Sequence, residues 1–133
     1  MFKLLRIENG RMNVPSPAFY DIAAATTVSI GDALVLSSGK LVKPTTATAK
    51  PEFIAMGEKG VTAEDTKLAV CRCAPNQLWG VPCSGTFKSV VPGAKVALGT
   101  DNASVDLNAT GAITVENLNG ATAAGDEIIV RIV

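Results

Sequence analysis

The final stretch of the chain, "GATAAGDEIIVRIV" (Gly120–Val133), resembles an earlier one, "GVTAEDTKLAVCRC" (Gly60–Cys73). Aligned without a gap, the two stretches match at Gly60/Gly120, Thr62/Thr122, Ala63/Ala123 and Val70/Val130, with Leu68 and Ile128 as equivalent apolar residues. Each combines turn-forming residues with a short run of β-branched and other apolar residues, which is typical of a corner that leads into a strand. The pattern predicts that one strand is built twice.

The similarity extends towards the N-terminus, where "VSIGDALVL" (Val28–Leu36) aligns with "VVPGAKVAL" (Val90–Leu98). Gly31 coincides with Gly93, and a glycine that recurs at the start of a strand indicates a positive φ or a sharp turn. We therefore predict two related halves, about 28–73 and 90–133, that close on each other and so remove most exposed strand edges. The alternative is a chance match, because many β-rich chains with glycine corners align with themselves somewhere.

Short apolar runs bounded by turn residues recur along the whole chain, and they predict strands. The runs are "ALVLSSGKLV", "EFIAMG", "KLAVCRC", "LWGVPC", "KVALG", "AITVENL" and "EIIVRIV". With 133 residues, 47% of them hydrophobic, one domain is expected. The predicted fold is all-β: a small single-domain β-barrel or sandwich with an internal pseudo-repeat, in which residues 1–25 form an extended N-terminal arm and residues 26–133 the β-domain.

The composition argues against several classes of function. The chain has no His and a formal net charge of zero. The absence of His removes Ser-His and Cys-His nucleophile pairs, and no phosphate-binding, dinucleotide-binding or zinc-protease motif is found. Scattered Lys and Arg residues form no basic stripe, so nucleic-acid binding is not expected. No apolar run is long enough to cross a bilayer and no secretion signal is recognised, so we expect no membrane association and synthesis in a cytoplasm.

The three cysteines, Cys71, Cys73 and Cys83, are expected to be free thiols. An odd number does not indicate a disulfide framework, and a zinc site would need a fourth ligand that neither Cys nor His supplies. The carboxylates mostly flank turn residues, where Asp and Glu are ordinarily solvated. We therefore predict no catalytic residue, no metal site and no cofactor.

The N-terminal segment differs from the rest of the chain. It contains the extended "NVPSP" stretch, whose two prolines cannot lie in a central strand. Its first residues alternate between apolar and charged, as in a strand that could add to the edge of a sheet in this chain or in a neighbour. The alternative interpretation is that the segment simply pairs as the first strand of its own domain.

Five stretches together resemble the small β-rich decoration, or cement, proteins of tailed bacteriophage and prophage heads. They are "MFKLLRIENGRMNVPSP", "TTVSIGDALVLSSGKLV", "KPEFIAMGEKG", "TKLAVCRCAPNQLWGVPCSG" and "AAGDEIIVRIV". The resemblance covers nearly the whole chain. It implies a non-enzymatic protein that is often trimeric and that binds the outside of an icosahedral shell.

The resemblance, taken with the N-terminal arm, predicts partners and an anchoring surface. The partners would be the major capsid protein and further copies of this chain in a homotrimer, and the protein would lie on the outer surface of the virion. The candidate capsid or subunit interface residues are Phe2, Leu4, Arg6, Arg11, Pro15, Pro17, Phe19 and Tyr20. Two other functions stay open: another phage component, such as a fibre base or tail part, and a small-ligand-binding β-barrel.

Overall fold

The computed structural model describes residues 1–8, 17–23, 26–59 and 66–133. Within these ranges the chain forms strands and no helix, which confirms the predicted all-β class, and no segment could cross a membrane as a helix. The strands are β1 (Lys3–Ile7), β2 (Ala18–Ile22), β3 (Ala33–Ser37), β4 (Lys40–Val42), β5 (Phe53–Ala55), β6 (Thr66–Arg72), β7 (Gln77–Ser84), β8 (Lys95–Leu98), β9 (Val105–Asp106), β10 (Ile113–Asn117) and β11 (Glu127–Ile132).

The first half of the chain closes into a five-stranded barrel with the order β2-β4-β3-β5-β6. Neighbouring strands are antiparallel except β2 and β4, which are parallel and meet at Ile22 and Leu41. This parallel contact joins the two edges of the sheet. We call this barrel the first ring.

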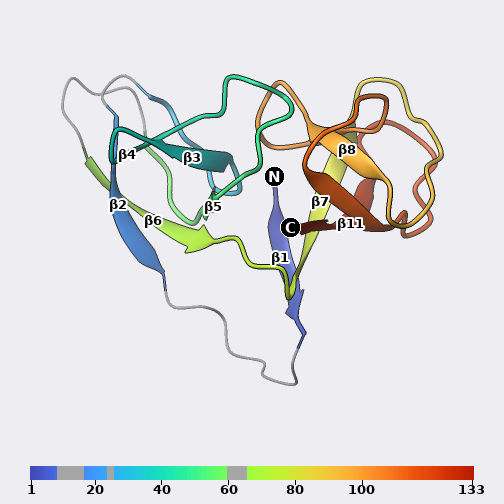
Figure 1. Ribbon diagram of the computed structural model, residues 1–133, viewed down its shortest axis with the longest axis horizontal. Coiled ribbons are helices and arrows are strands. Elements are labelled where there is room, and N and C mark those ends of the chain that lie inside the picture. The colour runs from blue at the N-terminus through green and yellow to red at the C-terminus, as the bar shows by residue number, and fades with distance from the viewer. Residues whose placement is uncertain (9–16, 24–25, 60–65) are drawn as a thin grey trace.

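The second half repeats this arrangement with β7-β9-β8-β10-β11, which we call the second ring. Its closing contact is again parallel, between Cys83 of β7 and Val105 of β9. One strand has no counterpart among the described residues of the first ring: β1 pairs antiparallel with β7 as an additional edge strand. The two rings lie side by side along the long axis of the molecule, and β1 lies between them (Figure 1).

The register of pairing is the same in both rings, so the internal repeat is structural. Val70 of β6 lies between Ala55 and Ala18, and the equivalent Val130 of β11 lies between Val115 and Trp79. The pairs Ala33–Ile54 and Leu34–Phe53 correspond likewise to Lys95–Thr114 and Val96–Ile113. Equivalent strands therefore occupy equivalent places.

The recurrent corner glycines also coincide in structure. Gly31 has a φ of 87° and Gly93 a φ of 91°. The Gly31 N–H donates to the carbonyl of Ala55 at 2.8 Å, and the Gly93 N–H donates to that of Val115 at 2.7 Å. The second predicted pair, Gly60 with Gly120, involves a residue outside the described ranges.

Two expectations about organisation need correction. The halves do not close on each other, because each half forms a closed ring of its own. In the first ring β2 joins β6 to β4, and in the second ring β7 joins β11 to β9. The described parts of the expected arm, 1–25, are not extensions either. β1 pairs with β7 and β2 belongs to the first ring, so both described strands of the N-terminal segment pair within their own chain.

Apolar side chains fill the interior of both rings. In the first ring the buried residues are Ile22, Val28, Leu34, Leu41, Phe53, Ala55, Leu68 and Val70. Their counterparts in the second ring are Val90, which is partly buried, and the buried Cys83, Val96, Val105, Ile113, Val115, Ile128 and Val130. The second core also takes in Phe2 and three residues from the first half, Ala33, Ile54 and Cys71. The two rings are thus joined by shared apolar packing.

Candidate functional site

An apolar pocket lies where the two rings meet and has a volume of about 250 Å³. It is lined by Met1, Phe2, Lys3, Leu4, Ile30, Ile54, Ala55, Met56, Cys71 and Trp79. These residues come from β1 and the two residues before it, from the corner before β3, from β5 and the residue after it, and from β6 and β7. The pocket is therefore a product of the contact between the rings.

The N-terminal strand forms one wall of this pocket because the Gly31 corner holds it there. The Phe2 N–H donates to the carbonyl of Gly31 at 2.9 Å. A Cβ at position 31 would overlap the Cβ of Met1 and would lie 3.0 Å from the Phe2 carbonyl oxygen. Glycine at this corner therefore permits the close approach of β1, in addition to the positive φ.

The chemistry of the pocket suits apolar contact rather than catalysis. The ammonium of Lys3 forms an ion pair with Glu127 at 2.8 Å. Burial raises the pKa of the Cys71 thiol, which leaves it protonated and a poor nucleophile near neutral pH. The indole N–H of Trp79 is buried without a hydrogen-bond partner among the described residues. The pocket can accept an apolar group by burial of apolar surface.

Exposed apolar side chains surround the pocket. Met1 is 49% exposed, Ile30 46% and Met56 37%. Clustered exposed apolar surface on a small protein commonly marks a contact with another molecule, and methionine adapts to irregular partners. We call Met1, Ile30 and Met56 the pocket rim.

The predicted interface residues lie on two different elements. Phe2 and Leu4 line the pocket, and Phe2 is only 2% exposed, so it serves the core and not an exposed arm. Pro17 and Phe19 are exposed at the start of the first ring, and Phe19 is 61% exposed. Arg6 is exposed and lies 3.6 Å from Glu8. Arg11 and Pro15 fall outside the described ranges.

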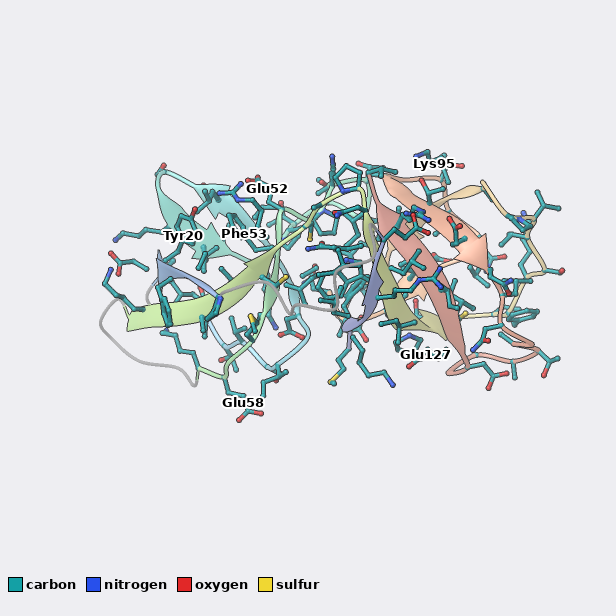
Figure 2. All side chains as sticks on the ribbon, turned by 90° about the horizontal axis from the view of Figure 1, so that it is seen from below. Tyr20, Glu52, Phe53, Glu58, Lys95 and Glu127 are labelled. Carbon is teal, nitrogen blue, oxygen red and sulfur yellow. The ribbon has the colours of Figure 1, made fainter. Side chains whose placement is uncertain are left out.

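Tyr20, the remaining candidate, is half-buried and packs within the first ring. Its hydroxyl accepts a hydrogen bond from Arg72 at 2.8 Å, and its ring centre lies 4.9 Å from that of Phe53. Figure 2 shows Tyr20 and Phe53 close together on the first ring, with Glu127 on the second. Tyr20 is therefore held by its own ring.

Sequence reasoning missed the pocket residues outside the N-terminal segment. Ile30, Met56 and Trp79 occur in different apolar runs, and nothing local in those runs indicates that they meet. The available signal was the repeated glycine at position 31, which marks the corner next to Ile30 but does not reveal that β1 lies against it.

A second group of side chains fixes the far end of β1. The guanidinium of Arg131 donates to Glu8 at 2.7 Å, to Glu116 at 2.8 Å and to the carbonyl of Pro75 at 3.1 Å. The hydrogen bond from Arg131 holds the pKa of Glu8 below its usual value, and the bonds to Glu116 and Glu8 raise the pKa of Arg131. This cluster joins β1, β10, β11 and the connection between the rings.

In the described part of the chain, no group of three or more Cys, Asp or Glu side chains is placed to hold a metal ion, and all three cysteines are free thiols. Burial raises the pKa of Cys73 to about 12 and also raises that of Cys83. No protein-family model and no curated protein matches the chain. The arguments about function therefore rest on the pocket and the surfaces around it.

Proposed function

We propose that this protein is a non-enzymatic structural component of a tailed-bacteriophage virion. It binds the outer surface of the expanded head as a homotrimer and stabilises the shell against the pressure of packaged DNA. The observation that carries the proposal is the exposed apolar rim, Met1, Ile30 and Met56, around an apolar pocket.

Such a role requires a binding surface and no catalytic group. A protein that binds only the expanded lattice stabilises that lattice by mass action, as any ligand stabilises the state that it prefers. Many symmetric copies attached at several points gain avidity, so each contact can be modest in area. An apolar side chain of the shell protein that enters the pocket would supply one such contact.

The test uses expanded heads assembled from the major capsid protein encoded in the same genome as this chain. Met56→Asp and Ile30→Asp place a charge on the rim, and occupancy on heads is measured by co-sedimentation. We expect each to weaken binding by about tenfold or more, because an uncompensated charge would be buried. Val91→Asp is the matched control, since Val91 is 73% exposed and does not line the pocket.

Three results would count against the proposal. They are unchanged occupancy of the rim variants, a genome without a capsid gene, and recovery of the protein with tails or fibres and not heads. Sedimentation velocity of the free protein tests the trimer separately. Circular dichroism of each variant shows that the fold is kept.

A small-ligand-binding function is the second candidate, and the pocket between the rings favours it. The ring interiors are filled by side chains, so a ligand would bind between the rings and not inside a barrel. Native mass spectrometry of the protein purified from its host is the test. A bound small molecule that Met56→Trp displaces would favour this function over head binding.

A further inference from the structure

The two rings can be compared strand by strand, and the comparison concerns the outer edge of β7. There β1 adds as an antiparallel strand, with Lys3 opposite Gly80 and Leu4 opposite Trp79. The Phe2 N–H points away from β7 and donates to the carbonyl of Gly31. Because the backbone N–H and C=O groups of successive residues in a strand point to opposite sides, those of Lys3 face β7. The Glu8 N–H donates to the carbonyl of Asn76 at 2.7 Å and closes the other end.

The equivalent edge of the first ring belongs to β2. All of β2 pairs with β6 on one side, but on the other side β4 reaches only Ile22. The Ala23 N–H donates to Leu41 at 3.1 Å, so the backbone groups of Asp21 and Phe19 face the same side as that N–H. On this outer side, away from β6, no strand within the described ranges pairs with β2 at Phe19.

The side chains on the two equivalent edges also differ, since those of the second ring are covered and those of the first ring are exposed. Phe19 occupies the place that Gly80 has in the second ring, because Phe19 pairs with Ala69 and Gly80 with the equivalent Ile129. Leu5 and Glu127 cover the surface above Gly80. Phe19 is 61% exposed, so an aromatic ring lies bare where the second ring is covered.

We propose that the outer edge of β2 is a strand-addition site. It takes an extended segment of another polypeptide, which runs antiparallel to β2 and carries a basic residue opposite Phe19. Exposed strand edges are ready templates for such pairing, and β1 demonstrates the geometry on an edge of the same fold.

The chemistry of the partner follows from the side chains beside this edge. The aliphatic stem of a Lys or Arg opposite Phe19 packs on the aromatic ring, as cross-strand neighbours do. Its charged head then lies near Asp21, two residues along the same face. Asp21 is exposed and pairs with the exposed Lys67 at 3.5 Å, an ion pair that a new cation can replace at little cost. Pro17 has no N–H, which ends the pairing on that side.

The β1 strand of a second copy is not the occupant of this edge. In each copy β1 already pairs with its own β7, and Phe2 is buried in the shared core. Release of β1 from its own chain would expose both the edge of β7 and the side chain of Phe2. The proposal goes beyond head binding, because it concerns β2 of the first ring and not the pocket rim.

The test uses the full-length protein and a synthetic peptide with the sequence of residues 1–8, MFKLLRIE, as the probe. Backbone amide shifts are followed by NMR during titration. We expect saturable changes at Ala18–Ile22. N-methylation of the peptide at Lys3 should weaken binding by about tenfold, because it removes a backbone hydrogen bond to the edge. N-methylation at Leu4, whose N–H faces away, should leave the affinity within about twofold, since no bond to the edge is lost.

A matched pair of protein variants tests the side-chain contact. Phe19→Ala should weaken peptide binding several-fold, whereas Val91→Ala, at a still more exposed apolar position on the second ring, should not. Three outcomes would overturn the proposal: no saturable binding at millimolar peptide, shifts confined to Gln77–Gly80 through displacement of the chain's own β1, or equal effects of the two N-methylations.

Discussion

Gly31 and Gly93 occupy the same corner of the two rings but have different surroundings. Both have a positive φ, which disfavours any residue with a Cβ. A Cβ at Gly31 would overlap Met1, whereas a Cβ at Gly93 would meet nothing within 4 Å. Substitutions at the two positions can therefore separate two contributions to the loss of stability: the unfavourable backbone conformation, which both share, and the displacement of the N-terminal strand, which occurs only at Gly31.

We predict that Gly31→Ala destabilises the protein more than Gly93→Ala. Gly93→Ala should cost about 1–2 kcal/mol for the left-handed backbone alone. Gly31→Ala should cost about 1–3 kcal/mol beyond that, as expected for an overpacked site. Urea unfolding of both variants measures the difference. Equal losses would mean that β1 moves aside without cost.

Glu8 and Arg131 predict a dependence of stability on pH. The pKa of Glu8 is lowered in the folded protein, chiefly by the hydrogen bond from Arg131. A lowered folded pKa gives stability that is fully present above the unfolded value of about 4.3 and is lost as the pH falls through the folded value. The melting temperature of Glu8→Gln should therefore fall less than that of the wild type between about pH 5 and pH 3. Parallel curves would show that the ion pair adds no pH-dependent stability.

At the level of single residues, the sequence allowed the glycine corners to be predicted and not the pocket. Gly31 and Gly93 recur because a backbone conformation requires them, and such requirements leave an identical residue in both copies. Met56 and Ile30 carry no comparable local requirement. They become neighbours only through the packing of the rings, which acts over a long range in sequence.

At the level of strands, β1 is an integral part of the core. Phe2 is 2% exposed and packs in the core that joins the rings, whereas Phe19 is 61% exposed. We predict that Phe2→Ala lowers the free energy of unfolding by about 3–5 kcal/mol, because it empties a buried aromatic site. Phe19→Ala, the control, should change it by at most about 0.5 kcal/mol. Denaturant unfolding measures both, and a small loss for Phe2→Ala would restore the picture of a detachable arm.

Most strands were predictable, but the strands that close the rings were not recognised as equivalent. The runs "EFIAMG" and "AITVENL" contain β5 and β10, which pair with β6 and β11 in equivalent register. β2 and β7 also occupy equivalent places, yet "AFYDI" (18–22) and "WGVPC" (79–83) share no residue. Their equivalence lies in backbone pairing and in one buried apolar position, Ile22 or Cys83, and many sequences satisfy both requirements, so no identical residue is kept.

For the whole molecule, the shared core predicts a single unfolding transition. Ala33, Ile54 and Cys71 of the first ring pack in one cluster with Trp79 and the interior of the second ring. Neither ring can then unfold without exposing apolar surface of the other. Trp79, the single tryptophan, reports on the junction by fluorescence, and far-UV circular dichroism reports on all strands. Their thermal midpoints should coincide, and two separate midpoints would show independent rings.

The pairing of β1 with β7 has a consequence for synthesis on the ribosome. Ile7 pairs with Gln77, so β1 is made first and its partner emerges only after every strand of the first ring. At about 5–20 residues per second, β1 waits several seconds without a partner. On a crowded polysome, neighbouring nascent chains expose β7 during the same interval. Capture of β1 by a neighbour's β7 therefore gives a route to intertwined oligomers that form at birth and are not reached by mixing finished chains.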